Sequence, residues 1–514
     1  MLSLNNAIAR LGSQHVEISA EDQAKPQPKP KSKPGADKDA TYLAEFASRI
    51  LMIGYGSVGQ AILPLVLRHV KVNPQDITVL EVGENEERFE AIHGNLPIKY
   101  VKNEIVEGNL DEVLGSYLKA GDLLINVSLN IDGCAIVQWC LEHDVMYVDT
   151  SIERWRDEPD ETIPKKSERT LYHTHQKIRK MALPYADAAT CVVTHGANPG
   201  LVSHFVKAAL LDIAKAMNLP PDVPTNREDW AKLMQATGTK VIHISERDTQ
   251  VIDKPKLKGE FVNTWSCEGF WAEGRAPAEL GWGTHEAKSP YNGFIHKEGE
   301  GPGNAAYLDQ PGVATLVKSW VPLGGEFNGF LVQHSESVTI SEYFSIGEGA
   351  EAEYRPTVHY AYQPCDAAIV SVHEFRGREL EMQTHQRIAK DEIVSGIDEL
   401  GVLLMGHGKN AWWYGSQLGI DEARKLIPRE SATSVQVAAS LIATIVWMIQ
   451  HPNEGYTEPD YLPHEEILKV ARLYLGPVAS VQTDWTPLED RNVLFKRPLD
   501  PKNLWRFENF RVWS

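Results

Sequence analysis

The six residues GYGSVG, at positions 54–59, restrict the fold of this chain more than any other feature of its sequence. The apolar run RILMIG leads into them, and a stretch with the apolar spacing of a helix follows. Gly54 permits a tight turn, Gly56 lets the backbone approach a pyrophosphate, and Gly59 lets a helix pack closely on a strand. The N-terminus of that helix presents N–H donors and a partial positive charge. The segment therefore predicts a dinucleotide-binding turn between a strand and a helix.

A carboxylate about 20 residues beyond this turn indicates which dinucleotide is bound. In Rossmann-type domains such a residue accepts hydrogen bonds from the adenine ribose, and here Glu81 ends the apolar run ITVLE. Because a carboxylate repels a 2′-phosphate, we expect NAD rather than NADP as the cofactor. The residues expected to contact NAD are Gly54, Tyr55, Gly56, Ser57, Val58, Gly59, Glu81, Ser128 and Thr150.

Strand-like and helix-like segments alternate from this turn to residue 215. Short β-branched runs such as DLLINVSL and VMYVDTS are separated by helical patterns such as CAIVQWCLEHD. This alternation predicts βαβ units and a Rossmann-type, doubly wound parallel sheet of the α/β class. Residues 239–425 instead carry alternating apolar and polar runs with frequent glycine and proline. That pattern predicts a second, α+β domain with a mixed or antiparallel sheet.

Local composition indicates the boundaries of the remaining segments of the chain. The N-terminal stretch AKPQPKPKSKPGADKDA predicts a disordered, Pro/Lys-rich leader. The apolar run 435–449 is shorter than the roughly 20 residues that cross a bilayer, so we expect a buried helix. The predicted order is a leader at 1–46, an NAD-binding domain at 47–215, a substrate and dimerisation domain at 216–430, helices returning to the first domain at 431–476, and a C-terminal tail at 477–514.

Charge and cysteine content limit the partners and the compartment. The 70 Asp and Glu residues exceed the 51 Lys and Arg residues and leave a net charge of −19. Nucleic acid and anionic membranes bind through Lys and Arg, so neither is an expected partner. The five cysteines are scattered without CxxC spacing, which indicates reduced thiols in the cytoplasm and no metal site. The N-terminus also lacks the apolar segment of a secretory signal.

Acidic and aromatic residues gather in two stretches of the second domain. Glu246, in KVIHISERD, shares strand parity with two isoleucines, so it is either a buried acid that meets a cation or a solvent-exposed acid at a strand end. The stretch 261–286 contains four acids and one base among its tryptophans. Such a set suits an ammonium group, although tryptophan clusters also form ordinary cores. A turn into a helix at 267–269 would place Trp265 and Glu273 about 12 Å apart.

Two further polar residues are candidates for the site. Asn198, in HGANPG, lies where a late strand of the first sheet meets its helix, and ligands bind beyond the carboxyl ends of such strands. The alternative for Asn198 is a plain Asn-Pro-Gly turn. His334 follows an apolar run, and its near-neutral pKa suits proton transfer, whereas a lone histidine is more often structural.

At these residues the sequence resembles the bacterial-type homospermidine synthases of the saccharopine-dehydrogenase-like family. The resemblance extends over residues 47–510 and rests on MIGYGSVGQ, YVDTSIE, THGANPG, HISERDTQ, NTWSCEGF, ELGWGTHE and GNAAYLDQPG. It implies a tightly held NAD, a homodimer, and aminobutyl transfer in polyamine biosynthesis. Two putrescines, or spermidine plus putrescine, would give homospermidine with release of ammonia or diaminopropane.

The resemblance also implies which residues form the site. The implied catalytic and diamine-binding residues are Glu246, Trp265, Glu273, Asn198, His334 and Glu153. Trp265 matches the aromatic residue that contacts the charged amine, and Glu246 and Glu273 match acids of the amine site. Asn130 and Asp132 both remain candidates for a position that is acidic in relatives.

Two other functions remain as alternatives. An NADPH-dependent reductive condensation enzyme of the carboxyspermidine or saccharopine dehydrogenase type would need Arg or Lys to bind a substrate carboxylate. Glu81 and the acidic stretch 261–286 argue against that enzyme. A non-catalytic dinucleotide sensor would need no substrate pocket, and it would leave Glu246, Trp265 and Glu273 far apart.

Overall fold

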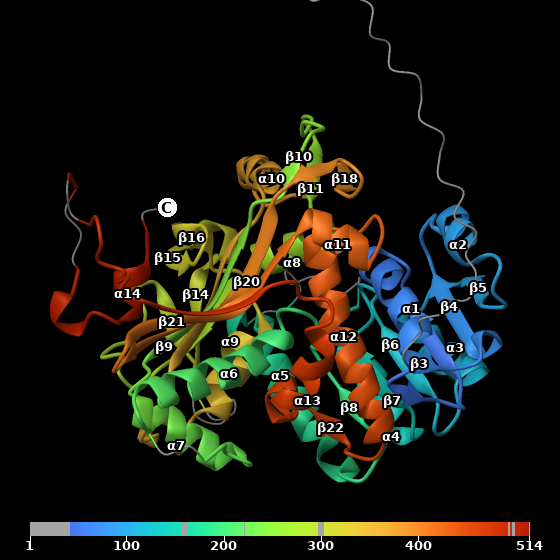
Figure 1. The fold of residues 1–514 in the computed structure, drawn as a ribbon, viewed down its shortest axis with the longest axis horizontal. Helices are drawn as coiled ribbons and strands as arrows, with labels where there is room; N and C mark the ends of the chain where they lie inside the picture. Colours follow the sequence, from blue (N-terminus) through green and yellow to red (C-terminus); the bar gives the residue numbers. More distant parts are fainter. Residues whose placement is uncertain are drawn as a thin grey trace, which may run out of the picture. The chain divides into compact units, whose positions relative to one another are not determined.

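The computed structural model of the protein describes residues 42–155, 163, 165–219, 222–296, 303–491, 494–495 and 499–512. Most of the predicted leader, residues 1–41, lies outside the described residues. Two large sheets organise the described chain, one parallel and one mixed (Figure 1).

The first sheet is parallel and has seven strands. Its spatial order is β5 (Lys99–Lys102), β4 (Ile77–Glu81), β2 (Ile50–Ile53), β6 (Leu123–Asn126), β7 (Met146–Asp149), β8 (Cys191–Val192) and β22 (Tyr456–Thr457). Counted along the chain, the first six strands follow the 3-2-1-4-5-6 order of dinucleotide-binding domains. The predicted α/β fold with a Rossmann-type sheet is therefore confirmed.

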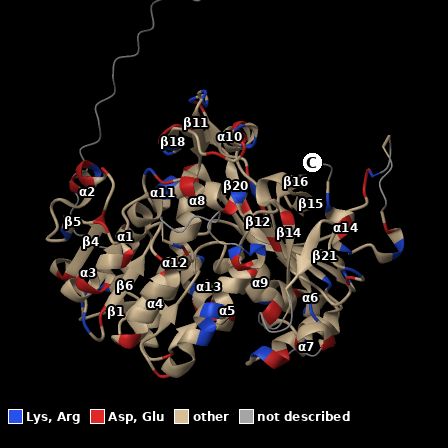
Figure 2. Cartoon of the chain, turned by 180° about the vertical axis from the view of Figure 1, so that it is seen from behind, with Lys and Arg blue, Asp and Glu red and all other residues tan. Residues whose placement is uncertain are grey.

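Helices cover both faces of this sheet because alternate side chains of a strand point to opposite faces. Ile50 and Met52 share a core with α1 (Ser57–His69), whereas Leu51 and Ile53 share a separate core with other helices. The other helices of the dinucleotide-binding domain are α2 (Glu86–His93), α3 (Leu110–Tyr117), α4 (Gly133–Glu142), α5 (Leu171–Ala182) and α6 (Leu201–Ala216). In Figure 2 acidic residues colour parts of α2 and α3 red, and basic residues colour part of α5 blue, so both signs of charge occur on these helices.

Residues 42–46 correct the predicted extent of the leader. β1 (Ala44–Glu45) pairs in parallel with β3 (Val70–Lys71), which directly follows α1. Ala44 and Phe46 are buried in the core beside α1. Backbone pairing and burial of these apolar side chains make the segment part of the fold.

The second sheet is mixed and has ten strands, as predicted for the second domain. Its main path is β13 (Gly293–Ile295), β14 (Ala305–Pro311), β12 (Pro277–Gly281), β17 (Thr357–Gln363), β9 (Val241–Asp248), β20 (Ile397–His407), β21 (Asn410–Gly419) and β23 (Val478–Thr483). Off this path, β16 (Gly325–Phe330) pairs with β17, and β15 (Leu316–Val321) pairs with β16. The central strand β9 runs parallel to β17 and antiparallel to β20. Side chains of these three strands therefore meet near the middle of the sheet.

Smaller elements surround the second sheet. Two strand pairs, β11 (Glu260–Asn263) with β18 (His385–Ile388) and β10 (Val251–Ile252) with β19 (Ile393–Ser395), lie apart from it. Its helices are α7 (Arg227–Thr237), α8 (Cys267–Arg275), α9 (Ser335–Tyr343), α10 (Asp366–Gly377) and α11 (Ile420–Leu426). α9 contacts β12 and β17, and α6 of the first domain contacts β20 and β21, so these two helices pack directly on the sheet.

The C-terminal part returns to both sheets. α12 (Ala432–Gln450) is the one helix among the described residues that is long and apolar enough to cross a membrane, and 89% of its most apolar stretch is buried inside the protein. It packs on α1 and on α13 (His464–Ala471), as a core helix does. α14 (Phe507–Phe510) buries both of its phenylalanines against the second sheet.

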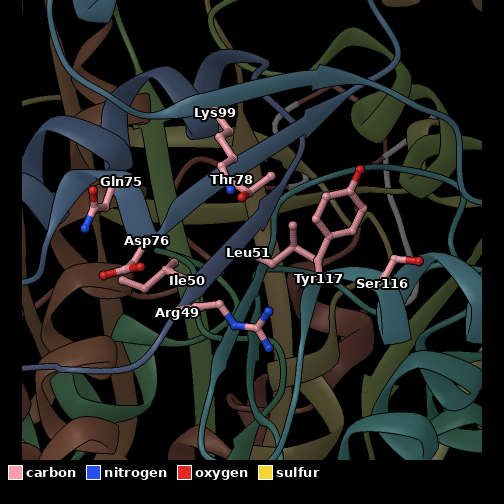
Figure 3. A pocket seen from close by; sticks show the side chains of 9 residues that line it. All are labelled: Arg49, Ile50, Leu51, Gln75, Asp76, Thr78, Lys99, Ser116 and Tyr117. Carbon is pink, nitrogen blue, oxygen red and sulfur yellow. The ribbon is translucent and has the colours of Figure 1, made fainter.

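A cavity of about 190 Å³ lies near the start of strands β2 and β4 (Figure 3). Its lining includes Arg49, Thr78, Lys99 and Tyr117. The glycine turn follows the opposite end of β2, so this cavity is separate from the predicted dinucleotide site.

Candidate active site

The glycine turn joins β2 to α1 in the geometry that a dinucleotide requires. Gly54 has a φ of +95°, which a residue with a side chain rarely adopts. A Cβ atom at Gly59 would lie 2.4 Å from the carbonyl oxygen of Gly54, so only glycine allows helix and turn to approach this closely. A Cβ at Gly56 would meet open space, which leaves its backbone accessible to a phosphate. The turn therefore fits a pyrophosphate at the N-terminus of α1.

Glu81 lies under this turn, at the carboxyl end of β4. One carboxylate oxygen accepts a hydrogen bond from the backbone N–H of Tyr55. The other accepts from the N–H groups of Val82, at 2.9 Å, and Gly83, at 2.5 Å. Glu81 therefore shapes the turn itself, in addition to its predicted contact with the ribose.

The side chain of Tyr55 lies in the hydrophobic core. It is fully buried and packs against the rings of Phe89 and Tyr100, at 5.3 and 6.3 Å between ring centroids. Only the backbone of Tyr55 can therefore serve the cofactor. Ser128 and Thr150 follow β6 and β7, at the same edge of the sheet as the turn.

Asn198 and Glu246 meet although 48 residues separate them. The side-chain amide of Asn198, beyond the end of β8, donates to Glu246 Oε2 at 2.6 Å. It also lies 2.6 Å from the hydroxyl of Tyr360, on β17, and that hydroxyl donates to Glu246. Asn198 thus connects the carboxyl edge of the first sheet to the centre of the second.

Glu246 belongs to a group of three buried carboxylates. Asp248 is two residues further along β9, and Asp398 is its partner across to β20. Burial raises the pKa of Glu246 to about 7, and the charge of Asp248 adds to the increase. Burial and the charge of Glu246 raise the pKa of Asp398 as well. Three acids buried close together favour a protonated or cation-bound state.

Hydrogen bonds hold two of these carboxylates in place. Thr264 donates to Asp248 at 2.7 Å, and Thr433 donates to Asp398 at 2.5 Å. The second oxygen of Asp398 is buried and has no hydrogen-bond partner among the described residues. An ammonium group would satisfy that oxygen.

Trp265 forms an aromatic wall next to the carboxylates. Its indole N–H donates to the hydroxyl of Tyr362 at 2.9 Å, and the ring of Tyr362 stacks on Tyr360 at 5.3 Å. The chain turns into α8 at Cys267, with Ser266 as its N-cap. This is the helical turn that the pairing of Trp265 with Glu273 requires.

His334 lies between two carboxylates at the start of α9. Its Nε2 is 3.0 Å from Glu273 Oε2, and its Nδ1 is 3.2 Å from Glu336. Burial alone would lower the pKa of His334, but the two carboxylates raise it well above its ordinary value. The ring lies 4.4 Å from Tyr360, so the contacts run without a break from Trp265 to Glu273.

Glu153 lies beyond the end of β7 and interacts electrostatically with Glu273. Ser151 donates to its carboxylate at 2.9 Å. Burial raises the pKa of Glu153, and the charge of Glu273 raises it further. The carboxylate of Asp132 caps α4 at the N–H of Ala135, 2.8 Å away, so it is already engaged.

The structure thus brings five of the six predicted residues into one continuous set of contacts, and the charge of Glu273 acts on the sixth, Glu153. Five further residues of this set were not predicted from the sequence: Asp248, Asp398, Tyr360, Tyr362 and Glu336. Asp248 has the strand parity of Glu246, which was a usable signal. Asp398 and the tyrosines reach the site only through the register of β9 with β20 and β17.

Two family models and two sequence relatives match most of the chain. The family model described as Saccharopine dehydrogenase NADP binding domain matches residues 50–193, and that of the Saccharopine dehydrogenase C-terminal domain matches residues 196–480. The chain is 41% identical to a homospermidine synthase of Mesorhizobium japonicum, covering 93% of this chain and 99% of the relative. It is 41% identical to that of Blastochloris viridis, covering 90% and 97%.

A solved structure shares the fold across nearly the whole chain. The homospermidine synthase of Legionella pneumophila, in complex with NAD, is 40% identical and superposes with a TM-score of 0.84. The match covers 91% of this chain and 98% of that one.

Proposed function

Since the chain belongs to the homospermidine synthase family, we propose that it transfers an aminobutyl group between diamines with NAD as its redox cofactor. Putrescine, or spermidine plus putrescine, is the substrate. Homospermidine is the product, and ammonia or diaminopropane is released. The observation that carries the proposal is the unbroken set of contacts from the buried carboxylates through Tyr360 to His334.

The glycine turn and Glu81 suit NAD. The open space at Gly56 admits the pyrophosphate, and the carboxylate of Glu81 disfavours a 2′-phosphate. When bound, NAD takes a hydride from the carbon next to a putrescine nitrogen and returns it after the imine has exchanged amines. Because the hydride is returned, the reaction consumes no NAD.

The buried carboxylates hold the ammonium end of the diamine that stays charged. Glu246 and Asp398 supply negative charge, and the faces of Trp265 and Tyr362 supply cation–π contact. A desolvated cation–carboxylate pair is stronger than the same pair in water. This end of the site therefore favours a diamine over a substrate that carries a carboxylate.

His334 serves the reacting nitrogen. Glu273 and Glu336 keep its ring protonated at neutral pH, so it donates a proton to a leaving amine and recovers one from the incoming amine. Glu153, with its raised pKa, is a proton acceptor next to Glu273. The buried carboxylates thus keep one nitrogen of the diamine charged, and His334 changes the protonation of the reacting nitrogen.

We also propose that the enzyme is a cytoplasmic homodimer. The five cysteines are free and buried, which supports a reducing compartment. The homodimer rests on the resemblance to the family, and the acidic net charge supports diamines as partners over nucleic acid or membranes.

Product analysis tests the proposal. Purified protein with putrescine and NAD should form homospermidine and ammonia, identified by mass spectrometry, without accumulation of NADH. Deuterium on the carbons next to the putrescine nitrogens should appear in the product. Glu246→Gln should slow the reaction, whereas Glu465→Gln, an exposed acid on α13, should not. Stoichiometric NADH formation, or a requirement for NADPH, would contradict this function.

Cofactor choice is tested at Glu81. The parent should prefer NAD to NADP, and Glu81→Ala should reduce that preference because it removes the charge that repels a 2′-phosphate. Glu84→Ala is a matched control, because that acid is exposed and pairs with Lys102. Equal affinity of the parent for both cofactors would refute the assignment of Glu81.

A further inference from the structure

A side chain of the second domain reaches the glycine turn. Lys390, between β18 and β19, donates to Gln60 Oε1 at 2.8 Å. Gln60 is in the first turn of α1, and 330 residues separate it from Lys390. The second domain therefore contacts the helix whose N-terminus is the predicted pyrophosphate site.

Gln60 passes this contact to the turn. Its amide nitrogen donates to the carbonyl oxygen of Tyr55 at 2.8 Å, while the N–H of Tyr55 donates to Glu81. The backbone of Tyr55 is thus held on both sides. Because the neighbouring amides bind the pyrophosphate, this restraint orients the donors of the turn before the dinucleotide arrives.

Glu430 completes the connection on the other side of Lys390. Its two carboxylate oxygens lie 3.1 and 3.0 Å from the Lys390 ammonium, and one lies 3.3 Å from Arg88 on α2. Burial lowers the pKa of Lys390 and raises that of Glu430, as expected for a pair shielded from water. We name Gln60, Lys390, Glu430 and Arg88 the turn clamp.

The backbone of Lys390 is fixed within the second domain. Its carbonyl oxygen accepts from Arg424 at 2.8 Å, and its N–H donates to Glu392 at 3.2 Å. Glu392 in turn binds Arg387 at 2.8 Å. The backbone from which the Lys390 side chain extends is therefore held by residues of the second domain.

We propose that the turn clamp sets how long NAD stays bound, with Lys390 and Gln60 as positioning residues for the glycine turn. This inference rests on the NAD binding of the proposed function. A cofactor that takes and returns a hydride within one turnover has to remain in place between the two steps. A contact from the substrate domain to the turn meets that need, because both domains then hold the turn in its binding geometry.

Dissociation of the cofactor from the full-length protein tests the clamp. NADH release, followed by fluorescence after a chase with excess NAD, should be about ten- to hundredfold faster in Lys390→Met, as for loss of a charge-assisted hydrogen bond. Gln60→Met should have a similar effect. The double variant should release NADH little faster than either single variant, because both act through one connection.

A neighbouring ion pair provides the control. Arg429 and Asp391 lie next to Glu430 and Lys390 in sequence, and they form an exposed pair at 2.7 Å. Arg429→Gln should release NADH at the parental rate. Putrescine affinity at saturating NAD should be parental in Lys390→Met, since a positioning role at the turn leaves the diamine site unchanged.

The outcomes separate the clamp from the proposed function. Parental NADH release in both Lys390→Met and Gln60→Met overturns the clamp, and so does equal acceleration in Arg429→Gln. A parent protein that binds no NAD contradicts the proposed function instead. If Lys390→Met does not fold by circular dichroism, Gln60→Met and Lys390→Arg decide the question, with faster release in the first and near-parental release in the second.

Discussion

Removal of one hydroxyl, in Tyr360→Phe, tests the electrostatics of the buried carboxylates. The hydroxyl donates to Glu246, and the ring stacks on Tyr362 and lies against His334. Phenylalanine keeps the ring and therefore the packing. The variant removes the hydrogen bond that stabilises the ionised form of Glu246, together with the contact between the hydroxyl and Asn198, so the pKa of Glu246 should rise.

The size of the effect follows from the hydrogen bond that is lost. A hydrogen bond to a charged group contributes about 1.5–3 kcal/mol, and a pKa changes by one for about 1.4 kcal/mol. Glu246 starts from a pKa of about 7 and keeps its bond from Asn198. Its pKa should therefore increase by about 1 to 2. Because Asp248 and Asp398 interact with it, the measured value belongs to the whole group of acids.

The assay is the pH dependence of kcat/KM for putrescine. The ammonium binds the ionised form of Glu246, so activity should fall as pH decreases through the pKa. In Tyr360→Phe this fall should begin at higher pH, and activity near pH 7 should be about tenfold lower and recover in alkali. Tyr354→Phe is the control, because that buried hydroxyl donates to the carbonyl oxygen of Thr239. An unshifted profile, or an equal loss at every pH, would refute the reasoning.

Three further substitutions test diamine binding, the pairing of His334 and the stability of the fold. Trp265→Ala should weaken putrescine binding by up to about 2 kcal/mol, measured by calorimetry, and Trp265→Phe by less, because phenylalanine keeps an aromatic face. Glu273→Gln should lower the pKa of His334 towards its ordinary value, followed by NMR titration, because one of two carboxylates is lost. Arg179→Met should reduce the free energy of unfolding in urea by about 3–5 kcal/mol, since it leaves Glu458 buried without its bidentate partner.

A control measurement or a contradicting result accompanies each of these three expectations. Parental NAD affinity in both Trp265 variants shows that the diamine end alone is changed, and parental putrescine binding in Trp265→Ala would mean that this ring is only core. An unchanged imidazole titration in Glu273→Gln would rule out the pairing with His334. Lys232→Met, which breaks an exposed pair with Glu228, should change stability by no more than about 1 kcal/mol.

Ionisation of Glu246 also links stability to pH. Its pKa in the folded protein is above the ordinary value, so the stability gained from its neutral form is present at low pH and is lost as pH rises towards about 7. The ammonium group of a bound diamine stabilises the ionised form of Glu246. The ligand-free protein should therefore lose stability between about pH 5 and about pH 8, and putrescine should raise the melting temperature most at the upper end.

The sequence by itself determined the features that depend only on residues close together in the chain. The glycine turn, the strand before it and the helix after it are all encoded within residues 49–69, because turn geometry and helix period are short-range properties. The same holds for the buried character of residues 435–449 and for the turn into α8 that brings Trp265 towards Glu273. Motifs of this kind also carried the resemblance to the family.

Only the tertiary structure decided which side chains share the site. Asp398 joins Glu246 through the pairing of β20 with β9, and Tyr360 joins it through the pairing of β17 with β9. Strand register is set by core packing over the whole sheet, so a local pattern does not specify it. Lys390 likewise meets Gln60 only in the folded chain, because 330 residues separate the two in sequence.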